Sequence, residues 1–576
     1  MIRPSIAART FFALLAASSM ALLTACTPPA DNGAGETEAG AAEAPGHSSA
    51  AAAAAEAIVP EDLEAHIRYL ASDELGGRGP GSEGDALARR YLIDQLAALG
   101  YQPAGVNGSW EQPFDIVGVH STAPEEWTFR ADGKSVDLAW WDEYIASSGV
   151  QTPTARIDDA ELVFVGYGIQ APEYGWDDFS GADVTGKVLV ILNNDPEWDP
   201  ALFEGDRRLL YGRWTYKYEK AAQMGAAGAI IIHTTPSAGY PFQVVQTSWT
   251  GEQFEIPAGD EPRSQVEAWT TEAAMRSVLA LAGHDLDALS EAARSAEFQP
   301  VPLGIRTSLE LSNQLRRVET ANVLGMLAGS DPALAREVVV YSAHHDHLGI
   351  GSPDAEGDDI YNGALDNAAG CAQVLAIAKA FTELPEPPSR SILIAFVAAE
   401  EQGLLGSAYF AQNPTVPAGL MAANINYDGG SIWGAASDVT FIGYGKSSLD
   451  RVVDLYAGHQ GRTVKPDQFP DRGFFYRSDQ FNFAKVGVPA IYLDNGTEII
   501  GQDPAWGREQ IEAWEAKDYH QPSDELTDEW RFDGMVQDAQ LGFFCGVHVA
   551  ERPELPEWNP GDEFEAARRE ALAAGG

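Results

Sequence analysis

The chain has 576 residues, of which 45% are hydrophobic and 21% charged, a composition typical of globular proteins with sizeable cores. At roughly 100–200 residues per domain, this length predicts two to four domains. The chain has 37 Lys and Arg against 85 Asp and Glu, a net charge of −48, which disfavours binding to nucleic acids. With only three cysteines, a disulfide scaffold and a cysteine-rich zinc module are both excluded.

Residues 1–26 have the pattern of an export signal. Basic residues precede a short apolar run that ends in LTAC at residues 23–26. This ending resembles the lipobox of bacterial lipoproteins, in which cleavage leaves a lipidated cysteine, here Cys26, as the first residue. An ordinary signal peptide with an incidental cysteine is the alternative. The lipobox implies export and a membrane anchor made of acyl chains, and Thr27 favours the outer membrane.

The folded body begins after a tether and two helices. Residues 27–56 are rich in Ala, Gly, Pro, Ser and Glu and predict a disordered tether. Apolar residues at helical spacing predict amphipathic helices at 63–70 and 87–99. The glycine-rich loop between them, DELGGRGPGSEG, lacks the Lys-Ser/Thr pair of a phosphate-binding loop.

Residues 120–300 are richer in strands. Long loops rich in Trp, Pro and Gly separate these strands, and no cluster of titratable residues has the spacing of metal ligands. His233, at the end of a predicted strand, is interpreted as structural. The predicted strands are 161–169, 187–194 and 226–235, and a helix at 216–226 precedes the last of them.

The rest of the chain alternates between strands and helices. This alternation predicts an α/β fold with a doubly wound, mostly parallel sheet flanked by helices. The predicted strands are 337–346, 390–400, 421–428, 437–445 and 486–493, and the helices are 370–381 and 533–550. We expect the first two helices to cover the same sheet, which makes the strand-rich middle an insertion. The predicted domains are 57–125 with 303–550, an inserted domain at 126–302, and a tail at 551–576.

Histidines and carboxylates follow the ends of the predicted parallel strands. In open α/β sheets, functional sites form at the carboxyl ends of the strands. Two adjacent carboxylates at such an edge, Glu400 and Glu401, would repel each other unless a cation lay between them. Two histidines and three carboxylates are the mixture of ligands that suits zinc. The histidines and carboxylates near these strand ends include His344, Asp346, Asp366, Glu400, Glu401, Asp428 and His520.

Five motifs, SAHHDHLG, YNGALDNAAG, FVAAEEQGLLGS, NINYDGG and YHQPSDE, occur in this order. They resemble the metal-site motifs of the co-catalytic di-zinc exopeptidases, a family that includes bacterial zinc aminopeptidases and glutamate carboxypeptidases. The middle insertion resembles the protease-associated domain carried by many members. The resemblance implies the zinc exopeptidase fold, peptide substrates and two zinc ions per chain.

The resemblance also implies which residue binds which ion. His344 and Asp428 would bind one zinc. Glu401 and His520 would bind the other, and Asp366 would bridge the two. Each ion would then have three protein ligands and one position left for a water molecule.

The resemblance implies supporting roles for the remaining residues. Asp346 would orient the imidazole of His344, and Glu400 would be the general base. His345 and His347 stay unassigned, with a supporting or lining role preferred over metal binding. Tyr476, near the later motif YRSDQ, is a candidate for stabilising the tetrahedral oxyanion.

Three alternatives to an aminopeptidase stay open. A carboxypeptidase would need a cluster of arginines for the substrate carboxylate, and only Arg472 and Arg477 lie in the late part of the chain that would line the substrate. A glutaminyl cyclase-like enzyme uses one zinc and would not need both His344 and Asp428. A receptor-like protein of the same fold would have lost ligands or the base. The sequence leaves the oligomeric state and the side-chain specificity open.

Overall fold

The computed structural model describes residues 46, 48–199, 202–205 and 207–575. The chain divides into two units, Met1–Glu43 and Ala44–Gly576, and the first lies outside the described residues. The expected signal and most of the expected tether therefore also lie outside them. None of the described helices combines the length and apolarity needed to cross a bilayer.

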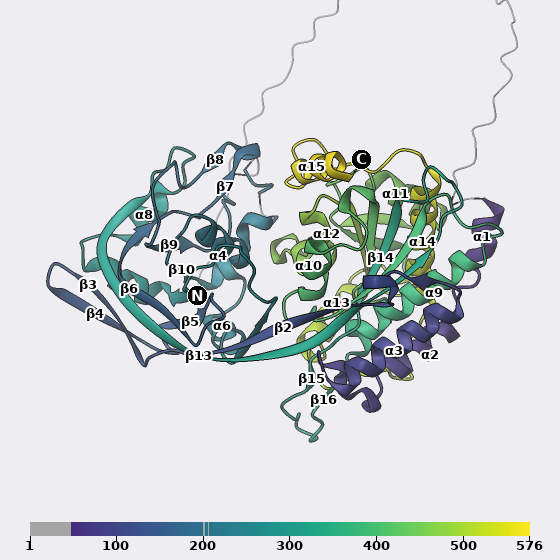
Figure 1. The fold of residues 1–576 in the computed structure, drawn as a ribbon, viewed down its shortest axis with the longest axis horizontal. Coiled ribbons are helices and arrows are strands. Elements are labelled where there is room, and N and C mark those ends of the chain that lie inside the picture. Colours follow the sequence, from purple (N-terminus) through teal and green to yellow (C-terminus); the bar gives the residue numbers. More distant parts are fainter. Residues whose placement is uncertain (1–45, 47, 200–201, 206, 576) are drawn as a thin grey trace, which may run out of the picture. The chain divides into compact units, whose positions relative to one another are not determined.

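A mostly parallel sheet forms the centre of the C-terminal half (Figure 1). Its four central strands are mutually parallel, and antiparallel strands pair on both sides of them. The prediction of an α/β fold with a mostly parallel sheet is thus confirmed. The order is β1(Gln102–Pro103), β13(Val301–Leu327), β17(Ser391–Val397), β14(Val338–His344), β18(Met421–Asn426), β21(Ala490–Asp494), β19(Asp438–Ile442) and β20(Thr463–Pro466).

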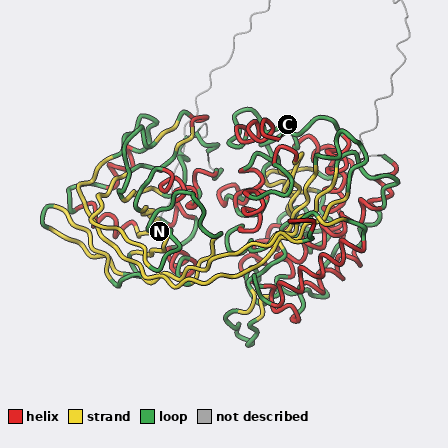
Figure 2. The backbone as a smooth tube through the Cα atoms, viewed as in Figure 1, coloured by secondary structure: helices red, strands yellow, loops and turns green. Residues whose placement is uncertain are grey.

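Strand β14 shows why this sheet is buried on both faces. Val339 and Tyr341 belong to the core on one side, and Val338 and Val340 to the core on the other. Such a continuous apolar run is typical of a parallel strand covered twice. Figure 2 shows helices on both sides of these strands. One face carries α2(Pro60–Leu70), α9(Gly370–Thr382) and α14(Asp533–Glu551), and the other α10(Leu405–Gln412) and α12(Gln480–Lys485).

The strand-rich middle builds its own sheet with a separate apolar core on each face. Strand β13 is 27 residues long and belongs to both sheets (Figure 1). The boundary expected at residue 303 therefore falls inside one continuous strand. The strands of the middle sheet run in the order β5(Tyr144–Ser148), β12(Val266–Thr271), β10(Gly228–His233), β9(Val188–Leu192), β6(Thr154–Phe164) and β13.

Two segments that we expected to be loose are packed instead. Helix α1(Ser49–Ala55) buries three alanines against α9 and α14, so the prediction of a disordered tether is wrong for its last residues. Alanine has the highest helix propensity, but an alanine run shows no apolar periodicity. In the expected tail, α15(Glu565–Gly575) buries Arg568, which donates a hydrogen bond to the carbonyl of Met421 at 2.9 Å.

Candidate metal centre

The predicted ligands follow the ends of neighbouring elements. Strands β17, β14 and β18 are adjacent and parallel, so their carboxyl ends bring together Glu401, His344 and Asp428. Asp366 lies in the turn before α9, and its peptide bond to the next residue is cis. His520 lies in the loop after α13(Trp506–Lys517). The structure brings all five residues to one edge of the sheet.

The carboxylate of Asp366 faces two imidazoles. Its Oδ1 lies 3.2 Å from Nε2 of His344, and its Oδ2 lies 3.2 Å from Nε2 of His520. Nε2 of His344 is also 3.3 Å from Oδ1 of Asp428, and Nε2 of His520 is 3.0 Å from Oε2 of Glu401. Two groups of donor atoms, each with one histidine and one terminal carboxylate, therefore share Asp366.

The donor set fits a zinc centre. Buried Nε2 of His520 makes no hydrogen bond of proper geometry within the described chain, although two carboxylate oxygens lie close to it, an arrangement expected of ligand atoms around a cation. Burial raises the pKa of Glu400 well above its usual range; His344 opposes this shift, and the carboxylates of Asp428 and Glu401 increase it. Imidazole and carboxylate donors suit zinc, which would offset this crowded negative charge.

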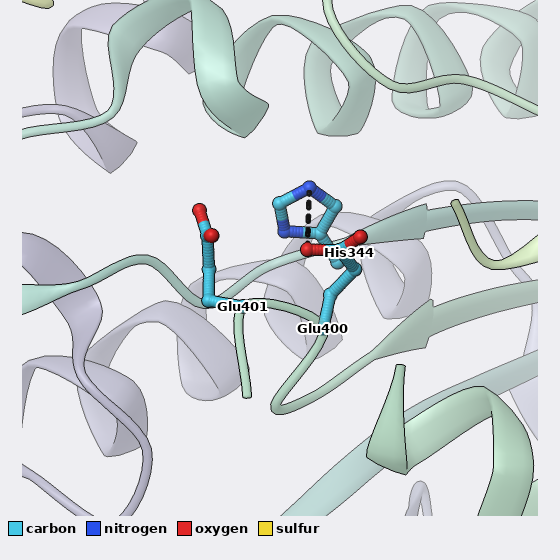
Figure 3. A group of neighbouring side chains, drawn as sticks. All are labelled: His344, Glu400 and Glu401. Carbon is cyan, nitrogen blue, oxygen red and sulfur yellow. Dashed lines mark ion pairs between the residues drawn. The ribbon is translucent and has the colours of Figure 1, made fainter. Parts of the chain in front are cut away.

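Glu400 lies beside the candidate ligands, but its carboxylate is farther from the imidazole of His344 than those of Asp366 and Asp428. Its Oε2 lies 3.9 Å from Nε2 of His344, compared with 3.2 Å and 3.3 Å for Asp366 and Asp428. Figure 3 shows Glu400 and His344 facing each other, with the carboxylate of Glu401 apart from that pair. Glu400 therefore lies outside the two groups of donors that share Asp366, although with His344 and Glu401 it forms a further group whose donor atoms lie within 4.8 Å of one another.

Asp346 supports the centre in a different way from the one expected. Its carboxylate accepts hydrogen bonds from the amides of Glu400 at 3.1 Å and Glu401 at 3.4 Å. Nδ1 of His344 lies 3.3 Å from the main-chain oxygen of Asp346 but 3.9 Å from its carboxylate. The turn after β17, with Ala399 at a φ of 56°, aims its amides at this carboxylate. Asp346 therefore fixes the turn that carries Glu400, and its main-chain oxygen approaches the imidazole of His344.

Each of the two unassigned histidines faces a carboxylate. Nε2 of His345 lies 3.1 Å from Oδ1 of Asp85, and both side chains are fully buried. Nδ1 of His347 lies 2.5 Å from Oε1 of Glu401, the oxygen that does not face His520. His347 thus contacts Glu401, and with Asp366 and Glu401 it also forms a group of possible metal donors.

Residues 322–543, which include this centre, match the sequence model of peptidase family M28. This part of the chain belongs to peptidase family M28. It is therefore a metallopeptidase domain, and we call it the M28 domain.

Two curated relatives match only in part. Leupeptin-inactivating enzyme 1 of Streptomyces exfoliatus is 25% identical over 210 residues, which are 36% of this chain and 43% of that protein. A vacuolar membrane protease of Verticillium alfalfae is 32% identical over 134 residues, 23% of this chain and 11% of that protein. The chain thus matches less than half the length of either relative.

The chain also resembles solved structures of aminopeptidases at low identity. The aminopeptidase from Aneurinibacillus sp. strain AM-1 is 18% identical with a TM-score of 0.48, covering 87% of this chain and 96% of that one. The zinc aminopeptidase of Bacillus subtilis is 16% identical with a TM-score of 0.39, covering 85% and 95%.

A buried arginine, which the sequence analysis missed, ties the loops of the M28 domain together. Arg78 lies in the glycine-rich loop between α2 and α3(Glu83–Ala98) and is 1% exposed. Its guanidinium donates to the carbonyl oxygens of His345 at 2.9 Å, Asn362 at 2.6 Å and Gly363 at 2.9 Å. One side chain from outside the M28 match therefore holds both the segment after His344 and the segment before Asp366.

Asp524 connects the segment that carries Asp366 with the loop that carries His520. This buried carboxylate accepts the amide of Leu365 at 2.9 Å with one oxygen and the amide of Asp366 at 3.0 Å with the other. Since Asp524 belongs to the loop of His520, it fixes the position of Asp366 relative to His520. The motif YHQPSDE contains this residue, but its spacing does not reveal the contact.

We expect Asp524→Asn to weaken zinc binding about 10- to 100-fold, the usual effect of losing a partner that orients a metal ligand. The introduced NH₂ group would face a main-chain N–H, so one of the two hydrogen bonds would be lost. Zinc titration of the apoprotein measures this effect. The matched control is Asp528→Asn, an exposed carboxylate in the same loop. Equal zinc affinity for the two variants would contradict the role of Asp524.

Tyr476 does not face the metal centre. It is buried, and its hydroxyl donates to Oε1 of Glu563 at 2.6 Å. The proposed role of Tyr476 at the oxyanion is therefore corrected: its turn directs the ring toward the C-terminal segment. Tyr492 and Tyr519 line the cavity of the M28 domain beside the metal centre instead.

That cavity has a volume of ≈ 320 Å³, within the usual size range of ligand sites. One end is formed by Asp366, Glu400 and Asp428, and the other by residues of α13 and of the loop 467–477. The inserted segment braces this loop, because the amide of Arg208 donates to the carbonyl of Pro470 at 3.1 Å. A peptide end bound here would lie directly against the candidate metal ligands.

Proposed function

We propose that the chain is a two-zinc aminopeptidase that removes residues from the N-terminus of peptides. The observation that carries the proposal is the carboxylate of Asp366, which turns one oxygen to His344 and the other to His520 at equal distances of 3.2 Å. Such a shared carboxylate suits two ions bound side by side. His344 with Asp428 would hold one ion, and His520 with Glu401 the other.

The chemistry divides between the metals and Glu400. Bound zinc supplies Lewis acidity, which polarises the scissile carbonyl and lowers the pKa of the attacking water. Glu400 accepts the proton of that water and delivers it to the leaving amine. Its position in the cavity wall and its raised pKa, caused by burial and by neighbouring carboxylates, suit a group that must hold a proton between these two transfers.

The charges around the cavity support an aminopeptidase over a carboxypeptidase. Besides the candidate ligands and Glu400, the cavity is lined by the carboxylates of Asp467 and Asp494, which favour a positively charged substrate end. Arg472 pairs with Glu515 at 2.6 Å and lies over the ring of Phe469, so it is already engaged. Arg477 is the other arginine among the described lining residues. One free arginine is a poor match for the cluster that a carboxypeptidase uses.

The test is a panel of peptides with free and acetylated N-termini, assayed with zinc-loaded and chelated protein. We expect cleavage of the free peptides only, two zinc ions per chain, and loss of activity on chelation. Cleavage from the carboxyl end would favour the carboxypeptidase. One zinc with cyclisation of N-terminal glutamine would favour the cyclase-like alternative, and zinc binding without any turnover would favour the receptor-like one.

We also propose that the protein is exported and anchored by lipid at Cys26, with residues 126–302 as a protease-associated domain. The signal pattern supports the first part, and the separate cores of the strand-rich middle support the second. We expect Cys26→Ser to move the activity from the membrane fraction to the soluble fraction. Activity that stays with the membranes in this variant would contradict the lipid anchor.

A further inference from the structure

The floor of the cavity is one face of two antiparallel strands. In β19 and β21, Ile442 is opposite Tyr492 and Thr440 is opposite Asp494, and all four line the cavity. The hydroxyl of Tyr492 lies 3.5 Å from the carbonyl oxygen of Asp428, which marks the metal end. Asp494 comes two residues later on the same face, roughly 7 Å farther along the strand.

Asp494 is a carboxylate without a cation of its own. It accepts the amide of Asn495 at 2.7 Å, and no Lys, Arg or His nitrogen of the described chain forms an ion pair with it within 4.0 Å. Burial raises the pKa of Asp494 to about 7; the amide of Asn495 opposes this shift, and the charges of Asp467 and Asp428 increase it. A positive charge beside Asp494 would therefore be stabilising.

The two arginines that line the cavity do not neutralise the negative charge of Asp494. Arg472 is paired with Glu515, and Arg477 is exposed and lies over the ring of Phe474 at 5.1 Å. Aromatic rings form part of the walls, and they suit the alkyl stem and the cationic head of a basic side chain. The aromatic residues of the walls are Trp433, Phe469, Phe474, Trp514 and Tyr519.

We propose that the cavity receives the side chain of the substrate's N-terminal residue and that Asp494 selects lysine or arginine there. The proposal rests on the proposed aminopeptidase function. A lysine side chain that extends from the metal end along this face of β21 would pass Tyr492 and bring its amine toward Asp494. A neutral side chain of equal length would cover the carboxylate without pairing with it, which is unfavourable.

The test compares kcat/KM for fluorogenic amides of lysine, arginine and norleucine, because norleucine has the stem of lysine without its charge. We expect lysine and arginine to exceed norleucine by about 10- to 100-fold, the range for a hydrogen bond between charged groups. In Asp494→Asn, the lysine-to-norleucine ratio should fall at least about tenfold. The control Asp528→Asn should keep the wild-type ratio.

Each outcome decides either the specificity or the function. Hydrolysis of norleucine amide as fast as lysine amide by the wild-type protein overturns the role of Asp494 and leaves the aminopeptidase standing. An unchanged ratio in folded Asp494→Asn also overturns it. If no free-amine substrate is cleaved by the zinc-loaded protein, the aminopeptidase function itself fails. Should the variant not fold, stronger competitive inhibition of the wild type by free lysine than by norleucine supports the proposal, and the reverse overturns it.

Discussion

Replacing Glu400 with glutamine is expected to lower kcat by about 10²- to 10⁴-fold, the usual contribution of a general base. Glutamine has the same shape, but it cannot accept the proton of water. Because Glu400 lies 3.9 Å from His344 and belongs to neither group of donors around Asp366, zinc content should be unchanged. Steady-state kinetics and metal analysis of the same sample measure the two quantities.

The matched control for this variant is Glu386→Gln, which alters an exposed glutamate away from the centre. Its kcat should equal that of the wild type. A Glu400→Gln protein that keeps full activity would remove Glu400 from the mechanism. A variant that loses zinc together with activity would instead make Glu400 a ligand.

Asp366→Ala should reduce bound zinc from two ions to at most one and lower kcat/KM by about 10³-fold or more. Both groups of donors use this carboxylate, so neither keeps three ligands without it. A metal Lewis acid contributes several kcal/mol to a transition state, and each 1.36 kcal/mol is a factor of ten in rate. Zinc titration with kinetics at saturating metal measures both effects.

A comparison with Asp428→Ala tests whether Asp366 is shared. Asp428 lies beside His344 only, so its loss should weaken one site and spare the other. We therefore expect Asp428→Ala to keep one tightly bound zinc and Asp366→Ala to weaken both. Two zinc ions bound with native affinity in Asp366→Ala would exclude a bridging role.

The sequence predicted the parallel sheet, and it predicted that the candidate ligands would meet at one edge of it, because both depend on local signals. An apolar run such as Val338–His344 reads as a strand buried on both faces, and adjacent parallel strands must end at the same edge. The motifs at those ends therefore had to meet. By contrast, β13 alternates exposed and buried residues over much of its length and carries many charges. Its sequence therefore did not predict one continuous strand shared by the two sheets.

The unpredicted parts depend on main-chain geometry. Arg78 donates only to main-chain carbonyl oxygens. Because every residue has such an oxygen, a motif of side chains cannot predict these hydrogen bonds. The carboxylate of Asp346 turns to the amides of Glu400 and Glu401 because of a positive φ at Ala399. Sequence motifs identified which residues meet at the centre, but they did not identify which atoms face one another.

Because Arg78 binds the segments next to His344 and Asp366, the candidate metal centre depends on a residue that lies outside the M28 domain. A fragment starting at residue 303 would contain every zinc ligand. It would nevertheless leave the carbonyls of His345, Asn362 and Gly363 without the cation that now satisfies them. Anyone wishing to shorten this protein or graft its chemistry onto another scaffold would therefore have to carry over the glycine-rich loop that lies ahead of the insertion.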